Sequence, residues 1–248
     1  MAKRNRKTLK NFFQKGQMPS EEHFSDLIDS MVNLVDEGFS KSIKDGLEIS
    51  SVGDSTKLIS FYKTNEDENS IWAIETEKES NNLAFSNEKK EKVLSLNEEG
   101  RVGIGTNHPE NTLDVNGIIS SQGRIGTYKT GLVPANGKWH PIVTELDGCH
   151  AFEVMAGVGK KKSGKYALMH AHALNTFNSE SRIYYHQAFF RILYNRIKLR
   201  WTGSMHNYSL EMKTRSNYGE NISVNYSIGN LWFDPFMDQC SNPNDMSK

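Results

Sequence analysis

Two histidines in the run LMHAHAL are the residues of this chain best suited to metal chemistry. His170 and His172 are two positions apart, so on a strand both imidazoles lie on one face, about 6 to 7 Å apart. That spacing can chelate zinc. A third ligand is needed, and although Glu153, His186 and His206 are available, nothing in the sequence brings any of them to the pair. We therefore predict no metal site, and interpret both histidines as half-exposed strand residues that hydrogen-bond to neighbours or face a subunit interface.

A cluster of lysines is the second candidate site. It comprises Lys160, Lys161, Lys162 and Lys165, next to Gly164. Further positive charge nearby in the sequence comes from Arg182, Arg191, Arg196 and Arg200. Such a patch would bind an anionic glycan, lipopolysaccharide or an acidic neighbour. The alternative is a solvated hairpin tip without a ligand.

No pattern in the chain predicts catalysis. A G-x-S-x-G elbow is absent, and Cys149 and Cys240 lie in no recognisable catalytic context, so we expect two free thiols. Gly103 and Gly105 begin like a phosphate loop, but no third glycine follows at the dinucleotide spacing and no lysine at the P-loop spacing. We predict a non-enzyme without cofactors; a glycosidase is the remaining enzymatic alternative.

Composition and charge describe an ordinary globular chain. Its 248 residues, 36% hydrophobic and 24% charged, suffice for one large domain or two to three small ones. Lysine plus arginine equals aspartate plus glutamate at 30 each, so no overall field favours nucleic acid or an anionic membrane. The basic N-terminus lacks the apolar region of a signal peptide, and no apolar run reaches about 18 residues. We expect cytoplasmic synthesis and no membrane insertion.

Residues 1–42 carry the helical signals. Pro19 and Ser20 mark a start and Gly38 a stop, while a shorter segment upstream predicts a second helix and hence a hairpin. Apolar residues fall at the i, i+3, i+4, i+7 spacing of a helix: Phe24, Leu27, Ile28, Met31, Leu34 and Val35. Two helices this short are marginal alone in water. We therefore predict an assembly surface on this stripe, the alternative being that both helices pack on the body of the same chain.

Residues 43–118 read as a thin β-meander. Strand-like runs of four to seven residues are separated by acidic, asparagine-rich turns. Strands of this kind expose much backbone edge and bury little apolar area in one chain. We therefore predict that residues 43–118 form an oligomeric neck.

Residues 119–235 predict an antiparallel, jelly-roll-like β-sandwich of about seven or eight strands, followed by a polar tail over 236–248. Inward positions alternate with polar ones. The expected inward residues are Phe152, Val154, Ala156, Val158, Ile197, Leu199, Trp201, Tyr208, Leu210, Met212, Ile222, Val224, Tyr226 and Ile228. This alternation places Trp201 in the core, whereas Trp139 and Trp232 invite a carbohydrate-binding interpretation.

The run GRVGIGTNHPENTLDVNG, residues 100–117, resembles the VGIGT-x-x-P-x-x-x-LDVNG repeat of phage tail-fibre-like and adhesin-like proteins, where it marks the stalk or the junction before a tip. Its stalk-turn residues are Gly103, Gly105, Pro109, Asn116 and Gly117, with Asn116-Gly117 predicted as a hairpin turn. The segments 7–33, 123–174 and 199–219 look like parts of a Bacteroidetes-type family associated with extracellular contractile injection systems.

The resemblance implies a structural subunit of a phage-tail-like contractile injection particle: a fibre, cap adaptor or similar accessory component. We expect a homo-oligomer, with the trimer implied by the family, docked on the tube, cap or baseplate of a particle that is released from the cell. The alternative is a receptor- or glycan-binding fibre tip.

Overall fold

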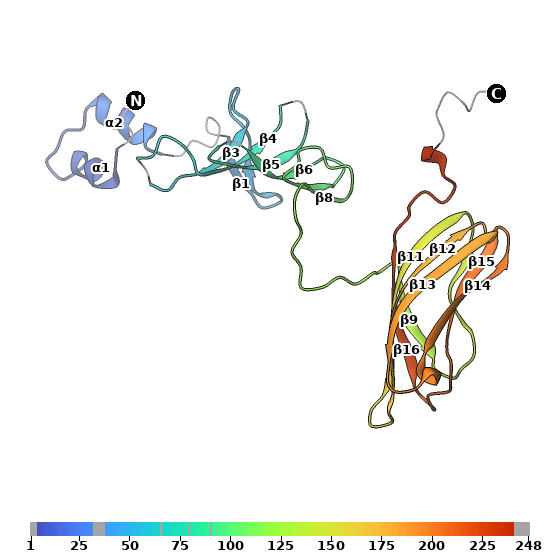
Figure 1. Cartoon of the computed structure of the whole chain (residues 1–248). Helices are drawn as coiled ribbons and strands as arrows, with labels where there is room; N and C mark the ends of the chain where they lie inside the picture. Colours follow the sequence, from blue (N-terminus) through green and yellow to red (C-terminus); the bar gives the residue numbers. More distant parts are fainter. Residues whose placement is uncertain (1–3, 32–37, 65, 79, 90, 241–248) are drawn as a thin grey trace, which may run out of the picture. The chain divides into compact units, whose positions relative to one another are not determined.

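A computed structural model of the chain describes residues 4–31, 38–64, 66–78, 80–89 and 91–240. The protein is mainly β, as predicted, and divides into two compact units, Met1–Ser120 and Ser121–Lys248 (Figure 1). The division falls after Ser120, close to the boundary expected after residue 118.

Two short helices open the first unit. Helix α1 (Arg6–Phe12) is capped by the Asn5 side chain, which accepts a hydrogen bond from the Thr8 backbone, and α2 (Glu21–Asp29) starts after Ser20. The rings of Phe12 and His23 stack at 4.0 Å, so the two helices form the predicted hairpin. No described helix is both long and apolar enough to cross a membrane.

The helical segment is shorter than the sequence predicts. Helix α2 ends at Asp29, and strand β1 (Phe39–Ser42) occupies the last part of the segment expected to be helical. Met31 lies beyond the helix end, while Leu34 and Val35 lie outside the described residues.

The rest of the first unit is a small ribbon and one single-layered sheet. Strands β1 and β2 (Gly46–Ile49) pair with each other. The sheet runs in the order β3-β4-β5-β6-β7-β8, with antiparallel neighbours except for the parallel pair β7–β8. Its strands are β3 (Lys57–Phe61), β4 (Trp72–Thr76), β5 (Leu83–Asn87), β6 (Lys92–Leu96), β7 (Val102–Ile104) and β8 (Leu113–Val115).

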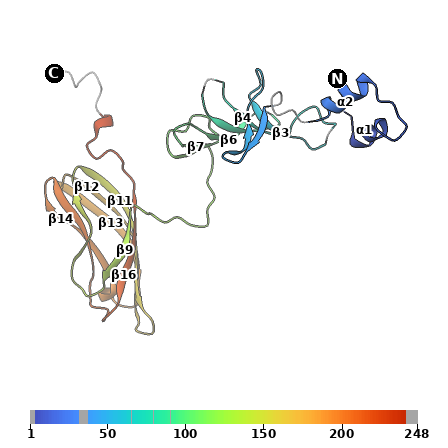
Figure 2. The ribbon, with the colours of Figure 1, turned by 180° about the vertical axis from the view of Figure 1, so that it is seen from behind.

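The second unit is an eight-stranded antiparallel sandwich, seen from both sides in Figures 1 and 2. A five-stranded sheet has the order β13-β12-β11-β16-β9, and a three-stranded sheet has the order β10-β15-β14. The strands are β9 (Lys129–Pro134), β10 (His140–Leu146), β11 (Cys149–Lys160), β12 (Lys165–Thr176), β13 (Glu180–Phe189), β14 (Ile197–Ser204), β15 (Asn207–Thr214) and β16 (Ser223–Asn230). Two 3₁₀ turns, Leu193–Asn195 and Asp238–Cys240, complete the described elements.

One hydrophobic core lies between the two sheets. Phe152, Met169 and Ile228 from the larger sheet are fully buried together with Leu210 and Met212 from the smaller one. The predicted alternation along β11, β14, β15 and β16 is confirmed, and Ile222 and Trp201 pack against the core while remaining partly exposed. The sandwich therefore has its own interior and supplies a rigid scaffold for residues on its outer faces.

Candidate assembly surface and outer face of the sandwich

One face of the six-stranded sheet is mainly apolar from edge to edge, with Thr76 and Asn87 as polar positions. Directly paired residues point to the same side of a sheet. The register pairs Ile74 with Phe85, Phe85 with Leu94, and Leu94 with Ile104. Further members at the same face are Ile59, Phe61, Trp72, Leu83, Leu96, Val102, Leu113 and Val115. We call these twelve residues the apolar neck face.

The apolar neck face is not covered by a second layer among the described residues. Trp72, Ile104 and Leu113 remain 44%, 42% and 58% exposed. Ala73 and Ala84 are the only buried hydrophobic residues described in this unit, and both lie on the opposite side of the sheet. Among the described residues of the first unit, the apolar neck face is thus only partly buried: four of its members are exposed and the other eight are half-buried.

The predicted assembly stripe of α2 is also exposed in part. Phe24 and Ile28 are exposed on the helix and Met31 is exposed beyond it, whereas Leu27 is half-buried. Phe24 packs edge-on against Phe13 of the other helix, with ring centroids 5.3 Å apart. The hairpin therefore holds itself together and still offers apolar side chains to a partner.

Two of the stalk-turn residues, Gly103 and Gly105, lie in or directly after β7, near the β8 edge of the six-stranded sheet. Gly103 lies in β7, where an added Cβ would stand 2.4 Å from the carbonyl oxygen of Thr106 and 2.5 Å from Ser95 Oγ. Gly105 has φ of +69°, a left-handed conformation that favours glycine, and its carbonyl accepts a hydrogen bond from Asn116 Nδ2 at 3.2 Å. The backbone at these glycines therefore accepts few other residues.

Of the other stalk-turn residues, Pro109 is buried beside the sheet, and Asn116 and Gly117 follow its last strand. Pro109 is buried, and its carbonyl accepts a hydrogen bond from Arg101 Nη1 at 3.3 Å. Asn116 and Gly117 do not form the predicted hairpin turn, because β8 is the last strand of this sheet and β9 belongs to the other unit. They lead the chain out of the sheet instead.

The lysine cluster forms the tip of the β11–β12 hairpin. Lys160 and Lys165 are paired at the ends of the two strands, and Lys161 and Lys162 lie in the exposed turn. The ammonium group of Lys165 is already hydrogen-bonded within the sandwich, because Nζ donates to the carbonyl oxygen of Asn217 at 2.8 Å.

The four arginines that lie near these lysines in the sequence contact different partners. Arg182 pairs with Glu180 at 3.0 Å and Arg200 with Glu211 at 2.7 Å, while Arg196 stacks over Phe189. Arg191 lies over the ring of Phe190. Trp139 is covered by Arg200 and Lys213, whose charged groups lie 4.3 and 4.6 Å from its ring centroid.

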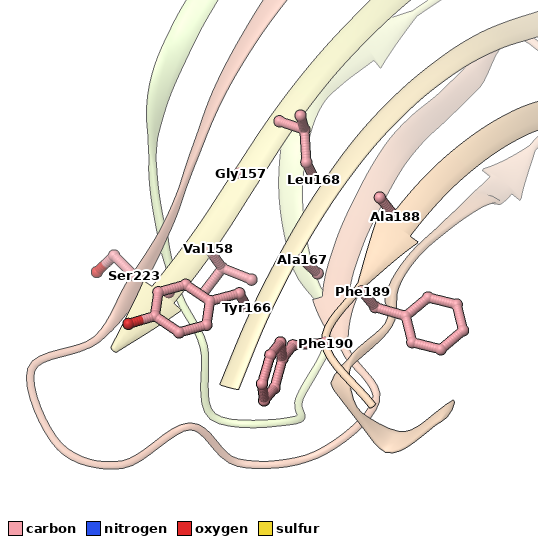
Figure 3. A pocket seen from close by; sticks show the side chains of 10 residues that line it. Gly157, Val158, Tyr166, Ala167, Leu168, Ala188, Phe189, Phe190 and Ser223 are labelled. Carbon is pink, nitrogen blue, oxygen red and sulfur yellow. The ribbon is translucent and has the colours of Figure 1, made fainter. Parts of the chain in front are cut away.

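The outer face of the five-stranded sheet carries an apolar groove of about 610 Å³ (Figure 3). Gly157 and Gly159 on β11 contribute no side chains to it, and the ring of Tyr166 lies over Gly159. Leu168 and Phe190 also line the groove. The rings of Tyr166 and Phe190 meet edge-on, with centroids 6.3 Å apart. Sequence reasoning missed this groove, although the glycines alternating along β11 were its signal.

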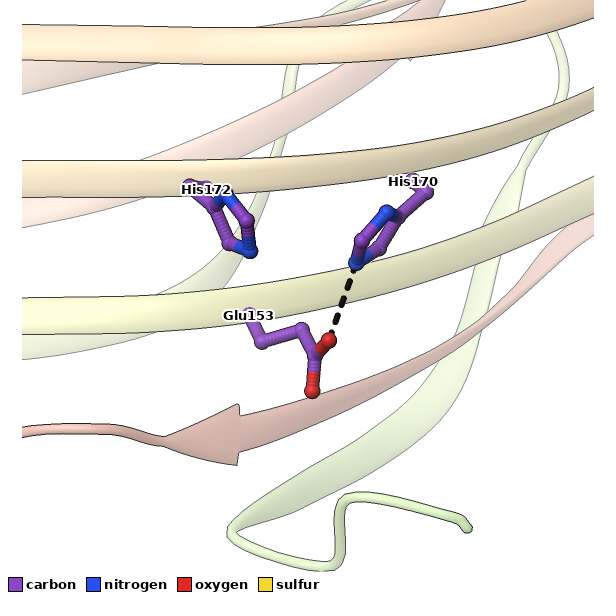
Figure 4. A group of neighbouring side chains, drawn as sticks. All are labelled: Glu153, His170 and His172. Atoms are coloured by element: carbon purple, nitrogen blue, oxygen red, sulfur yellow. Dashed lines mark hydrogen bonds and ion pairs between the residues drawn. The ribbon is translucent and has the colours of Figure 1, made fainter. Parts of the chain in front are cut away.

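The same face brings Glu153 to the two histidines (Figure 4). His170 Nε2 lies 2.9 Å from Glu153 Oε1 and donates its proton to the carboxylate. This hydrogen bond, assisted by the charge of Arg124, lowers the pKa of Glu153 despite partial burial, which acts in the opposite direction.

The other two histidines considered as a third ligand, His186 and His206, are not part of this group. His186 is the direct neighbour of His170 on β13, whereas His206 bonds to Asp147 through Nδ1 at 2.9 Å. Both cysteines are free, with Cys149 buried and Cys240 exposed, and burial raises the pKa of the Cys149 thiol.

No model of a protein family matches the chain, and no curated protein matches it either.

Proposed function

We propose that this protein is a non-enzymatic structural subunit of a phage-tail-like contractile injection particle, acting as a fibre, cap adaptor or similar accessory component. The apolar neck face is the observation that supports self-association in this proposal, and the resemblance of residues 100–117 to fibre-like repeats supports the role in a particle. A large apolar side chain gains about 1.5 to 3 kcal/mol when it is fully buried, and here twelve such residues share one side of a single-layered sheet. Copies of the same chain cover this face in the assembly.

The neck face suits association with copies of itself. Among the described strand pairs, the register places no charged residue on this side of the sheet, where Thr76 and Asn87 are the paired polar positions. Two copies meeting there therefore bring no charge out of water. Closed rotational symmetry is the usual arrangement of homo-oligomers, and the family resemblance favours three copies. The helical hairpin then supplies Phe24 and Ile28 for docking onto tube, cap or baseplate subunits, and the sandwich caps or connects.

Mass measurement of the full-length chain tests this proposal. By light scattering on a sizing column at micromolar concentration, we expect a trimer for the natural sequence and a shift to monomer for Ile104→Asp. Ile118→Asp is the matched control, because Ile118 is 100% exposed and follows the sheet rather than belonging to it. A monomeric natural chain, or an unchanged oligomer in the Ile104 variant, would contradict self-association through the neck face.

A receptor- or glycan-binding tip is the second candidate function, and the groove on the sandwich favours it. Tyr166 and Phe190 expose aromatic rings at the groove, and the ring of Tyr166 can lie flat over Gly159 because glycine has no side chain. Exposed rings at such a groove are able to stack on sugar faces. Glycan-array binding that is lost in Tyr166→Ala, with the oligomer intact, would assign the groove to recognition.

A further inference from the structure

Glu153, His170 and His172 form a three-residue constellation on the outer face of the sandwich. Strands β11 and β12 pair in a register that sets Glu153 directly opposite His172 and two pairs away from His170, which faces Met155. The intervening Val154 and Ala171 point into the core, so the three polar side chains lie on the outward side. Figure 4 shows both imidazoles and the carboxylate converging above the two strands.

The donor atoms of these residues are close enough to share one ion. One ligand atom from each lies within 4.8 Å of the others, and the imidazole centroids are 5.1 Å apart. A tetrahedral zinc ion with bonds of about 2.0 to 2.1 Å holds its donors about 3.3 Å apart. Small side-chain rotations close that difference because His170 and His172 stand on an open face. No other group of three such ligands occurs among the described residues.

Arg124 orients the carboxylate of this group. Its Nη2 lies 2.8 Å from both oxygens of Glu153, and the Glu153 side chain is only 17% exposed while that of Arg124 is 75% exposed. Carboxylates that bind metals are commonly held by a hydrogen bond to their second oxygen. Arg124 can fill that role at Oε2 once the ion replaces its contact with Oε1. The ion takes the place of the proton that now joins Oε1 to His170 Nε2.

We propose that Glu153, His170 and His172 bind one divalent transition-metal ion of the zinc class. Two imidazoles and one carboxylate are a zinc ligand set that leaves the fourth position to water or to a group from outside. His186 stands opposite His170 on β13 but lies outside the three-residue group. The ion ties β11 to β12 on a face that is open to a neighbour, and this inference does not depend on the proposed assembly role.

Metal titration of the full-length, tag-free chain tests the site. After removal of metals with a chelator, we expect calorimetry to show one Zn²⁺ per chain with a dissociation constant in the micromolar range or tighter. Co²⁺ in place of Zn²⁺ is expected to give the visible absorption of a tetrahedral centre. His170→Ala, His172→Ala and Glu153→Gln are each expected to weaken Zn²⁺ binding by at least about tenfold.

The control is His206→Ala, which removes a surface histidine bound to Asp147 and should bind Zn²⁺ like the natural chain. Circular dichroism of each variant checks that the sandwich is folded, as expected for changes on an outer face. Absence of Zn²⁺ binding by the folded natural chain would overturn the proposal. Unchanged affinity in folded His170→Ala and His172→Ala variants would overturn it as well, because the ion would then lie elsewhere.

Discussion

The side chain of Gln187 forms two hydrogen bonds with the backbone of Ile197. Its Nε2 donates to the Ile197 carbonyl oxygen at 3.1 Å, and its Oε1 accepts from the Ile197 N–H at 3.0 Å. Gln187 lies on β13 and Ile197 begins β14, which are edge strands of the two sheets. The glutamine amide thus replaces a missing backbone partner and joins the sheets where neither has a further strand.

Replacing Gln187 by leucine should lower the stability of the sandwich. Ile197 is fully buried, so its N–H and C=O would lose their partners, at a cost of about 1 to 3 kcal/mol. Urea unfolding followed by tryptophan fluorescence measures this loss in a Trp72→Phe background, because the other three tryptophans, Trp139, Trp201 and Trp232, lie in the second unit. Gln122→Leu, an exposed position before β9, is the control; equal midpoints for both variants would contradict the bridging role.

Replacement by alanine should disturb the structure at Gly103 but not at Gly117. At Gly103 a Cβ would collide with Thr106 and Ser95, whereas at Gly117 nothing lies within 4 Å. We therefore expect Gly103→Ala to open the β6–β7 edge and increase amide hydrogen exchange there. Gly117→Ala should leave the amide hydrogen exchange of the six-stranded sheet unchanged. Equal protection in both variants would show that the turn tolerates a side chain.

The pKa of Glu77 should lie well below that of an ordinary glutamate. A hydrogen bond and ion pair with Lys92, together with hydrogen bonds from Ser80 and Asn82, lowers the Glu77 pKa from 4.5 to about 2. The folded state favours the ionised carboxylate, so its stabilisation is complete above pH 4.5 and is lost as the pH falls towards about 2. A carboxyl-carbon NMR titration measures the midpoint directly.

Lys92→Met should move the Glu77 midpoint upwards, because the principal partner of the carboxylate is removed. Lys89→Met removes an exposed lysine from the β5–β6 turn and should leave the midpoint of Glu77 where it was. A midpoint near 4.5 in the natural chain would show that the Lys92 contact does not persist in solution.

A charge on the helical hairpin should block docking. Ile28 is exposed on α2, so Ile28→Glu removes an apolar contact without disturbing the Phe12–His23 stack. We expect the variant to remain folded and oligomeric but to be lost from purified particles. Lys15→Glu changes charge in the turn between the helices and controls for a general electrostatic effect. Normal incorporation of the Ile28 variant would remove the helix from the docking surface.

The sandwich was predictable because its signal is local. Every second residue is buried from Phe152 to Val158 on β11 and along β15, and Val154, Leu210 and Met212 follow that alternation directly in the sequence. The end of α2 was harder to predict from the sequence, because the apolar spacing continues to Val35 although the helix ends at Asp29. Apolar periodicity alone does not determine where a helix stops.

The sites required information that is not local. Glu153 and His172 are 19 positions apart and meet only through the β11–β12 register, so the histidine spacing could not identify the third ligand. The neck strands could be expected one by one, but the apolar neck face exists because Ile74, Phe85 and Leu94 fall opposite one another. Register is a property of paired strands, and a shift by one residue would turn each side chain to the other face.

The unequal interiors of the two units have a consequence for handling the protein. The sandwich encloses its own hydrophobic residues, so dilution should leave its melting temperature unchanged. A sheet whose apolar side chains are buried only when other chains bind becomes more stable as the protein concentration rises, by mass action. If copies cover the apolar neck face as proposed, we expect proteases to cut the first unit before the second at low protein concentration, where fewer copies are associated.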